Sequence, residues 1–215
     1  MSLIWDKVKI IAIIIGFFVI DQLLFILGIN FAAGFGMTLM INVLTVIVFT
    51  LFWLYAKKRQ LIAFGSVSAK SALLWVLGGY IAIYFFNYVG LTIVSLQASD
   101  NVHNQAILQQ IVAVSAPSFI SLFMILVGPL IEELICRYLI PKVLFKGYEP
   151  LGFVVGAVVF AALHVPQNLG SWIIYGGMGA VLSFVYYKSK RFEYSLLLHI
   201  INNAIAVAIL FMLVS

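Results

Sequence analysis

A few polar side chains lie within long apolar stretches of this 215-residue chain, and these residues could do chemistry. A polar group inside a lipid bilayer is costly, so each is a functional candidate. In chain order they are Asp21, Asn42, Asn87, Glu132, Glu133, Arg137, His164, His199, Asn202 and Asn203.

Two adjacent glutamates and an arginine occur together in the segment Gly128-Pro-Leu-Ile-Glu-Glu-Leu-Ile-Cys-Arg137. At about 100° per residue, Glu133 and Arg137 lie within roughly 40° of each other on one helix face, so they can form an ion pair. Glu132 points elsewhere and is left as the unpaired acid, which can take a proton from water. The alternative is a packing network of all three residues between helices.

Both histidines of the apolar segments have a partner one helical turn away. His164 follows Phe160 by four residues, and Asn203 follows His199 by four. His199 and Asn203 therefore share a face that can present two hydrogen-bond donors to one point, as an oxyanion hole requires. For each histidine alone, an interhelical hydrogen bond is the alternative.

The composition indicates where these residues lie. The chain is 65% hydrophobic and 9% charged, with a mean hydropathy of +1.19, whereas a soluble domain is roughly 45–50% apolar. We therefore expect an all-α integral membrane protein, a polytopic transmembrane bundle of about seven to eight spans that forms one domain over residues 1–215. The apolar runs are 9–29, 35–55, 72–96, 115–140, 151–165, 171–187 and 195–214.

The gaps between these runs predict the topology. Lys and Arg cluster in every second gap, so the positive-inside rule places the N-terminus in the cytoplasm and the C-terminus outside. The net charge of +5 therefore does not indicate a nucleic-acid partner, and a single Cys excludes an internal disulfide. The half-polar gap 97–113 predicts a short helix along the outer interface.

Two further expectations concern packing. The run 151–165 is short for a span, and Gly152 and Gly156 indicate close contact with a neighbouring helix. Asp21, Asn42 and Asn87 are interpreted as interhelical hydrogen-bonding residues.

Three motifs on separate predicted spans, Glu132-Glu133-x-x-x-Arg137, Phe160-x-x-x-His164 and His199-x-x-x-Asn203, resemble those of the CAAX protease and bacteriocin-processing (Abi) family of intramembrane endopeptidases. Each motif is weak alone, but their order and their placement on spans are specific together. The resemblance covers residues 115–214. The spans within residues 1–97 carry no recognised motif.

The resemblance implies a hydrolase without cofactor or metal. It implies that Glu132 and His164 hold and activate the water, that His199 and Asn203 stabilise the oxyanion, and that Glu133 and Arg137 support the site. Cys136 and Tyr138 flank Arg137 where family members often have Phe and Gly, which alters packing more than chemistry.

The resemblance also implies the partners. They are the lipid bilayer and a peptide or protein substrate, which is either a lipid-modified protein or a bacteriocin-type peptide. The reaction is then removal of a C-terminal tripeptide after a prenylated Cys, or bacteriocin processing and self-immunity in a bacterial cell membrane.

Several alternatives remain open. Glu132, His164 and His199 could form a two-histidine, one-carboxylate zinc site, although no His-Glu-x-x-His spacing is present. Cys136 lies one turn after Glu132 and could be a nucleophile, although a buried Cys more often packs inertly. A non-catalytic immunity or scaffold protein and a small proton-coupled transporter are the non-protease alternatives, and the absence of an internal repeat disfavours the transporter.

The predicted site has one geometric difficulty. Measured from the basic gaps along ideal straight helices, His199 is shallow, Glu132 intermediate and His164 deep in the bilayer. We expect the three side chains to meet only if the helices tilt.

Overall fold

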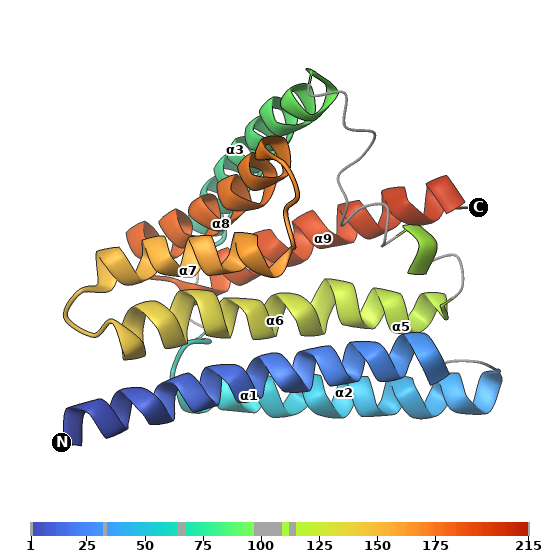
Figure 1. Cartoon of the computed structure of the whole chain (residues 1–215), viewed down its shortest axis with the longest axis horizontal. Coiled ribbons are helices and arrows are strands. Elements are labelled where there is room, and N and C mark those ends of the chain that lie inside the picture. The colour runs from blue at the N-terminus through green and yellow to red at the C-terminus, as the bar shows by residue number, and fades with distance from the viewer. Residues whose placement is uncertain (1, 32–33, 64–67, 97–108, 112–114, 215) are drawn as a thin grey trace.

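The computed structural model describes residues 2–31, 34–63, 68–96, 109–111 and 115–214, and these residues form helices and connections without a strand (Figure 1). Six helical segments are long and apolar enough to cross a membrane. Five are the single helices α1 (Ser2–Phe31), α2 (Phe35–Lys58), α3 (Ala69–Leu96), α8 (Leu169–Ser189) and α9 (Phe192–Val214). The predicted polytopic helical bundle is confirmed.

The sixth spanning segment, Pro117–Leu144, is composite. It consists of α5 (Pro117–Leu122), the π-helix η2 (Phe123–Val127), α6 (Gly128–Glu133) and the π-helix η3 (Leu134–Leu144). In Figure 1 this segment lies between α1 and α2 on one side and α7 and α9 on the other. Its side chains Phe119, Leu130 and Leu134 have no exposed surface, so it is the centre of the bundle.

Helix α7 (Glu149–Leu163) has only 15 residues. At 1.5 Å per residue it extends about 22 Å, less than the roughly 30 Å of a bilayer's hydrocarbon core. With α7 counted, seven segments run back and forth, and Figure 1 shows the two termini at opposite ends of the bundle. The interfacial helix predicted within 97–113 falls almost wholly outside the described residues.

Two prolines explain unpaired carbonyls in the composite segment. In η2 each N–H bonds the carbonyl five residues back, as Gly128 N–H bonds Phe123 O. Pro129 has no N–H, so the carbonyl of Met124 loses the partner that this pattern would give it. Pro141 in η3 has the same effect on the carbonyl five residues before it, that of Cys136.

Glycines allow α7 to approach η3 closely, as the sequence predicted. A Cβ on Gly156 would lie 2.1 Å from the Cys136 carbonyl oxygen, and one on Gly152 would lie 2.5 Å from the Cα of Pro141. Only hydrogen fits at either position. The hydrogen that replaces the Cβ of Gly156 points toward the carbonyl that Pro141 leaves without its π-helical partner, a weak C–H···O contact.

The interhelical role predicted for Asn42 is confirmed, since its Nδ2 donates to Ser118 Oγ at 2.8 Å. The same prediction is wrong for Asp21. Asp21 is only 6% exposed and accepts a hydrogen bond at Oδ2 from its neighbour Gln22 (3.1 Å). Its Oδ1 has no hydrogen-bond partner within the part of the chain that the structure describes. One turn to either side, Phe17 packs against Phe52 and Phe25 against Phe123, and the charged group that Asp21 faces on another helix is the carboxyl group of Glu132, a like charge that cannot donate to it when ionised. For Asn87 the role stays a prediction.

The glycine contact of α7 predicts the effect of one added methyl group. Gly156→Ala should lower the free energy of unfolding by about 1–3 kcal/mol, because the methyl group overpacks against backbone that cannot move aside. Alanine's better helix propensity, about 1 kcal/mol, offsets only part of this. Thermal unfolding in detergent measures the change.

Gly78→Ala in α3 is the matched control, since nothing lies within 4 Å of a Cβ there. This variant should be as stable as the parent or more so. Equal stability of the Gly156→Ala protein and the control would contradict the close α7–η3 contact.

Candidate active site

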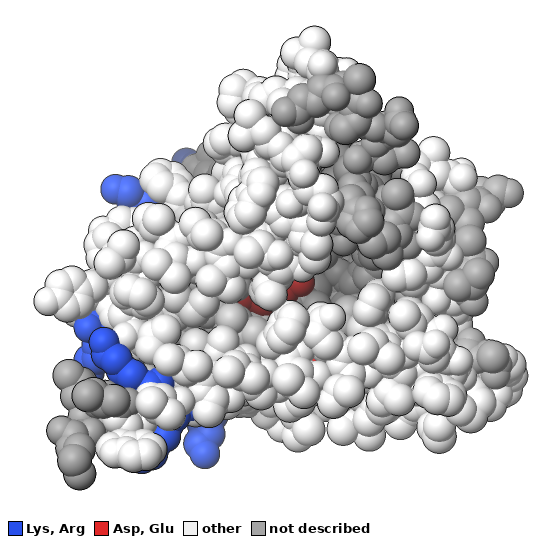
Figure 2. Space-filling model, in the orientation of Figure 1, with Lys and Arg blue, Asp and Glu red and all other residues white. Residues whose placement is uncertain are grey.

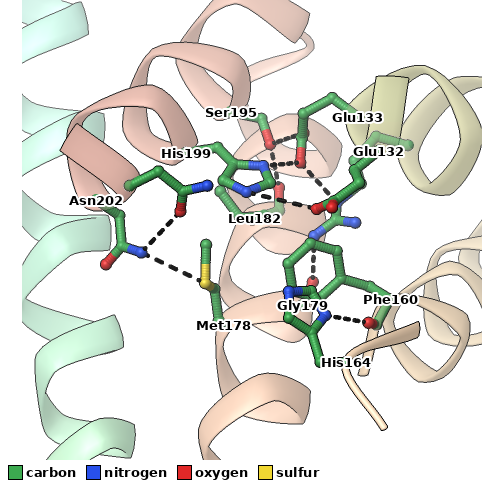
Figure 3. Close-up of polar contacts among 12 residues, drawn as sticks. Glu132, Glu133, Phe160, His164, Met178, Gly179, Leu182, Ser195, His199 and Asn202 are labelled. Carbon is green, nitrogen blue, oxygen red and sulfur yellow. Dashed lines mark hydrogen bonds and ion pairs between the residues drawn. The ribbon is translucent and has the colours of Figure 1, made fainter. Parts of the chain in front are cut away.

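Glu133 is the centre of a buried polar network and has no exposed surface (Figure 3). Its Oε1 lies 3.4 Å from Arg137 Nε, so the predicted ion pair is present, and both partners are fully buried. The same oxygen lies 3.2 Å from His199 Nδ1, and Oε2 accepts a hydrogen bond from the Ser195 hydroxyl. Glu133 therefore also holds His199, which the sequence did not indicate.

Arg137 connects this network to two other helices. Its Nη2 donates to the Gly179 carbonyl of α8 at 3.3 Å, and its guanidinium carbon lies 4.5 Å from the centre of the Phe160 ring of α7. Nε and Nη1 have no hydrogen-bond partner in the described ranges, so the contact of Nε with Glu133 is an electrostatic one. The arginine thus fixes α7 and α8 against the composite segment.

His199 bridges the two glutamates. A carboxylate only accepts hydrogen bonds, so we assign the proton of Nδ1 to the contact with Glu133. The other ring nitrogen, Nε2, lies 3.6 Å from Glu132 Oε2, slightly beyond hydrogen-bond distance.

Glu132 differs from Glu133 in its access to solvent. Its side chain is 24% exposed, whereas that of Glu133 is fully buried. Its Oε2 has no hydrogen-bond partner among the described residues. Figure 2 shows acidic atoms at the floor of a hollow in a face whose charged residues are otherwise basic and gathered at one end. Of the two adjacent glutamates, only Glu132 has an exposed side-chain surface.

His164 is held at the end of α7, where it is the C-cap residue. Its Nδ1 lies 2.8 Å from the Phe160 carbonyl, which can only accept, so Nδ1 carries a proton and Nε2 keeps a lone pair in the neutral ring. The ring stacks on Tyr175 with centroids 4.4 Å apart and contacts Phe160 at 4.7 Å. Tautomer and orientation are both fixed.

The structure does not bring His164 into hydrogen-bond contact with Glu132. Instead, the Phe160 ring contacts both histidines, at 4.7 Å from His164 and 5.5 Å from His199. The expectation that His199 and Glu132 would not meet is therefore wrong, since His199 reaches both glutamates, whereas the depth of His164 stays a prediction.

Asn203 does not point its donor to the same place as His199. Its Nδ2 donates to the Met124 carbonyl at 2.9 Å, the carbonyl that Pro129 deprives of its π-helical partner. Its neighbour Asn202 donates to Asn203 Oδ1 at 3.4 Å and contacts Met178 Sδ at 3.6 Å. In this conformation, the donor pair predicted for an oxyanion hole is divided between two acceptors.

Two residues of the site were missed from the sequence. Ser195 lies one turn before His199, so a polar stripe of Ser195, His199 and Asn203 along one face of α9 would have indicated it. Its hydroxyl also lies 3.0 Å from the Leu182 carbonyl of α8. Tyr175 carries no such signal, because its stacking on His164 depends on how α8 crosses α7.

The alternative chemistries find little support in this geometry. Among the described residues, no group of three or more His, Cys, Asp and Glu side chains could hold a metal ion. A zinc site would need Glu132, His164 and His199 to converge, and only Glu132 and His199 do. Cys136 is fully buried, without the partial exposure typical of a nucleophilic thiol.

Comparisons with known proteins agree with the motifs. Residues 114–205 match the family model described as Type II CAAX prenyl endopeptidase Rce1-like. The chain is 28% identical over 141 residues to the membrane-embedded CAAX protease MroQ of Staphylococcus aureus (strain USA300), which covers 62% of this chain and 56% of that protein.

It is also 34% identical over 79 residues to the UPF0177 protein YvdC of Lactococcus lactis subsp. lactis (strain IL1403), covering 37% of this chain and 30% of that protein. The chain thus spans about half the length of these relatives or less. No solved structure matches it significantly.

The buried ion pair predicts that removing one partner lowers the stability of the protein more than replacing both partners together. Arg137→Met should destabilise the protein by about 3–5 kcal/mol, because it leaves the Glu133 charge buried without its cation. Glu133→Gln combined with Arg137→Met should regain part of that loss, since no buried charge is then left unpaired. Unfolding of the purified protein in mixed micelles measures both.

Arg59→Met is the control, since Arg59 is an exposed arginine beside Tyr55 at the end of α2 and should change stability by less than about 0.5 kcal/mol. An Arg137→Met protein as stable as this control would show that Arg137 does not compensate Glu133.

Proposed function

We propose that the chain belongs to the family whose model, Type II CAAX prenyl endopeptidase Rce1-like, matches residues 114–205, and that it is an intramembrane endopeptidase that hydrolyses a peptide bond with a water activated by Glu132. The observation that carries the proposal is the contrast between the two glutamates. Glu133 is fully buried and engaged by Arg137, His199 and Ser195, whereas Glu132 has an exposed side-chain surface and, among the described residues, makes only the 3.6 Å ion-pair contact of its Oε2 with His199 Nε2.

In the proposed reaction, Glu132 acts first as a base and then as an acid. Its carboxylate takes a proton from water as the oxygen attacks the carbonyl carbon of the scissile bond. The C–N bond then breaks, and the proton passes from Glu132 to the leaving amine. The unprotonated Nε2 of His164 is the second acceptor proposed to hold this water.

The negative charge on the carbonyl oxygen requires donors in a site with little water. We assign the first to Nε2 of His199, which Glu133 orients through Nδ1 and which carries a proton when the ring is an imidazolium. Asn203 is the proposed second donor. Its Nδ2 would have to exchange the Met124 carbonyl for the substrate oxygen. Glu133 and Arg137 support the site by holding His199, α7 and α8.

The proposed substrate is a peptide or protein that reaches the hollow from the membrane. The relative MroQ is named as a CAAX protease, and the matching family model is that of a CAAX prenyl endopeptidase. These names support cleavage beside a lipid-modified Cys as the first setting to test. Processing of a bacteriocin-type peptide, with self-immunity, is the second.

Single substitutions test the assignment of Glu132. Glu132→Gln should lower kcat by about 10²–10⁴-fold, because the amide cannot accept the proton of water. His199→Ala and Asn203→Ala should each cost about 10²–10³-fold through the oxyanion. The assay is mass spectrometry of a peptide pool that contains farnesylated C-terminal peptides and bacteriocin-type peptides, with the enzyme in liposomes.

Cys136→Ser is the control and should cleave like the parent, with or without a chelator. Unchanged cleavage by the Glu132 and histidine variants would refute the mechanism. Loss of activity in Cys136→Ser alone would favour a thiol, and loss only with chelator would favour zinc. Proton flux without any peptide product would favour a transporter.

We also propose that the basic end of the bundle faces the cytoplasm. Figure 2 shows Lys and Arg gathered at one end, and the positive-inside rule assigns that end to the cytoplasm. This would place the start of α1 inside the cell and the end of α9 outside.

Cysteine labelling in intact bacterial cells tests this topology. In a Cys136→Ser background, a membrane-impermeant maleimide should label Phe35→Cys, at the start of α2, where the side chain is 85% exposed, and should label Lys146→Cys, between η3 and α7, only after permeabilisation. The reverse pattern would invert the topology, and labelling of both in intact cells would show that the two positions are not on opposite sides.

A further inference from the structure

An apolar groove separates α7 from α8 on the surface of the bundle. It has a volume of about 420 Å³. Small residues form part of its wall, namely Ala157 and Ala161 of α7 and Gly176 and Ala180 of α8. The rings of Phe153 and Tyr187 also line it. The hydroxyl of Ser183, which also lines it, donates to the Phe153 carbonyl at 3.3 Å. The groove therefore offers apolar contact.

Three lysines surround one end of this groove. Lys142 Nζ lies 5.5 Å from the centre of the Phe153 ring. Lys188 Nζ and Lys190 Nζ lie 5.8 and 4.2 Å from the centre of the Tyr187 ring. Both rings line the groove. Two acids of the described residues lie at this end. Glu149 interacts with Lys142 and Lys146, and Glu193 pairs with Arg191, so the five cations and two acids carry a net positive charge.

The length of the groove matches one leaflet of a bilayer. From Pro150 to Ala161, α7 rises on the order of 16 Å at 1.5 Å per residue. Half the hydrocarbon thickness of a bilayer is about 15 Å. The groove thus begins at the membrane end where the basic residues gather and extends to about the midplane.

We propose that this groove is a binding site for an anionic phospholipid, with an acyl chain between α7 and α8 and the phosphate among Lys142, Lys188 and Lys190. The charge at one end selects the occupant, because an uncharged apolar chain gains nothing from three ammonium groups, whereas a phosphate does. The bound acyl chain fills the groove between α7 and α8. The lipid thereby stabilises the helix pair that carries Phe160, His164 and Tyr175. The proposal does not depend on the protease assignment.

Native mass spectrometry of the full chain tests the site directly. The purified protein is mixed in detergent with phosphatidylglycerol or phosphatidylcholine, and the retained lipid is counted. The parent should retain one phosphatidylglycerol in preference to phosphatidylcholine. The triple variant Lys142→Gln/Lys188→Gln/Lys190→Gln should bind phosphatidylglycerol on the order of 100-fold more weakly and lose the preference.

Ala180→Phe should abolish retention of either lipid, since Ala180 is an exposed residue of the groove wall and the new ring fills the space of the chain. Two controls should behave like the parent. Lys7→Gln/Lys9→Gln removes two lysines of α1, and Leu74→Phe enlarges an exposed side chain of α3. Circular dichroism confirms that each variant is folded.

Three outcomes would overturn the proposal. Equal retention of both lipids by the parent removes the charge selectivity, and unchanged retention by the triple variant removes the phosphate site. The third outcome is that a farnesylated peptide displaces phosphatidylglycerol and that the triple variant binds this peptide as tightly as the parent does. The groove would then be a site for the lipid group of a substrate.

Discussion

The buried charge of Glu133 is the constraint on which the rest of the site depends. A carboxylate with no exposed surface in an apolar bundle must be compensated by cations and donors. Arg137 supplies one cation from the same segment, and α9 supplies His199 and Ser195. Since compensation requires α9 to lie against the composite segment, the interaction that neutralises Glu133 also orients His199 toward Glu132. The position of His199 beside Glu132 is in this sense a consequence of burying the adjacent Glu133.

The two prolines of the composite segment connect helix packing with the site in a second way. Each removes an N–H from the π-helical pattern, and each orphaned carbonyl meets a group from another helix: Asn203 of α9 at Met124, and Gly156 of α7 at Cys136. One proline therefore positions a proposed catalytic side chain, and the other seats the helix that carries His164. In the proposed reaction, Asn203 exchanges a structural acceptor for the substrate, so substrate binding would loosen this contact between α9 and the composite segment.

Local periodicity predicted much of this arrangement but not the contacts between helices. The apolar runs gave the spans, and a four-residue spacing gave the Glu133–Arg137 pair. The meeting of His199 with both glutamates was not predictable, because the depth estimate assumed straight α-helices, whereas the segment with the glutamates contains two π-helical stretches. The prediction of an interhelical hydrogen bond for Asp21 was wrong for another reason. The sequence shows that a buried acid needs a partner but not which side chains lie opposite, and here a second carboxyl group, that of Glu132, is the charged neighbour.

The short length of α7 gives a physical reason for chemistry with water at this place. The helix ends at Leu163, and Val165, a β-branched residue, has a left-handed backbone with φ 49°, which costs of order 1–3 kcal/mol. Irregular backbone at membrane depth is tolerated only where protein buries it or where it lines a water-filled cavity. The half-buried His164 lies at this end of the helix. A full-length α7 would continue its apolar surface past His164 and exclude the water that hydrolysis requires, so the early end of this helix is itself part of the proposed site.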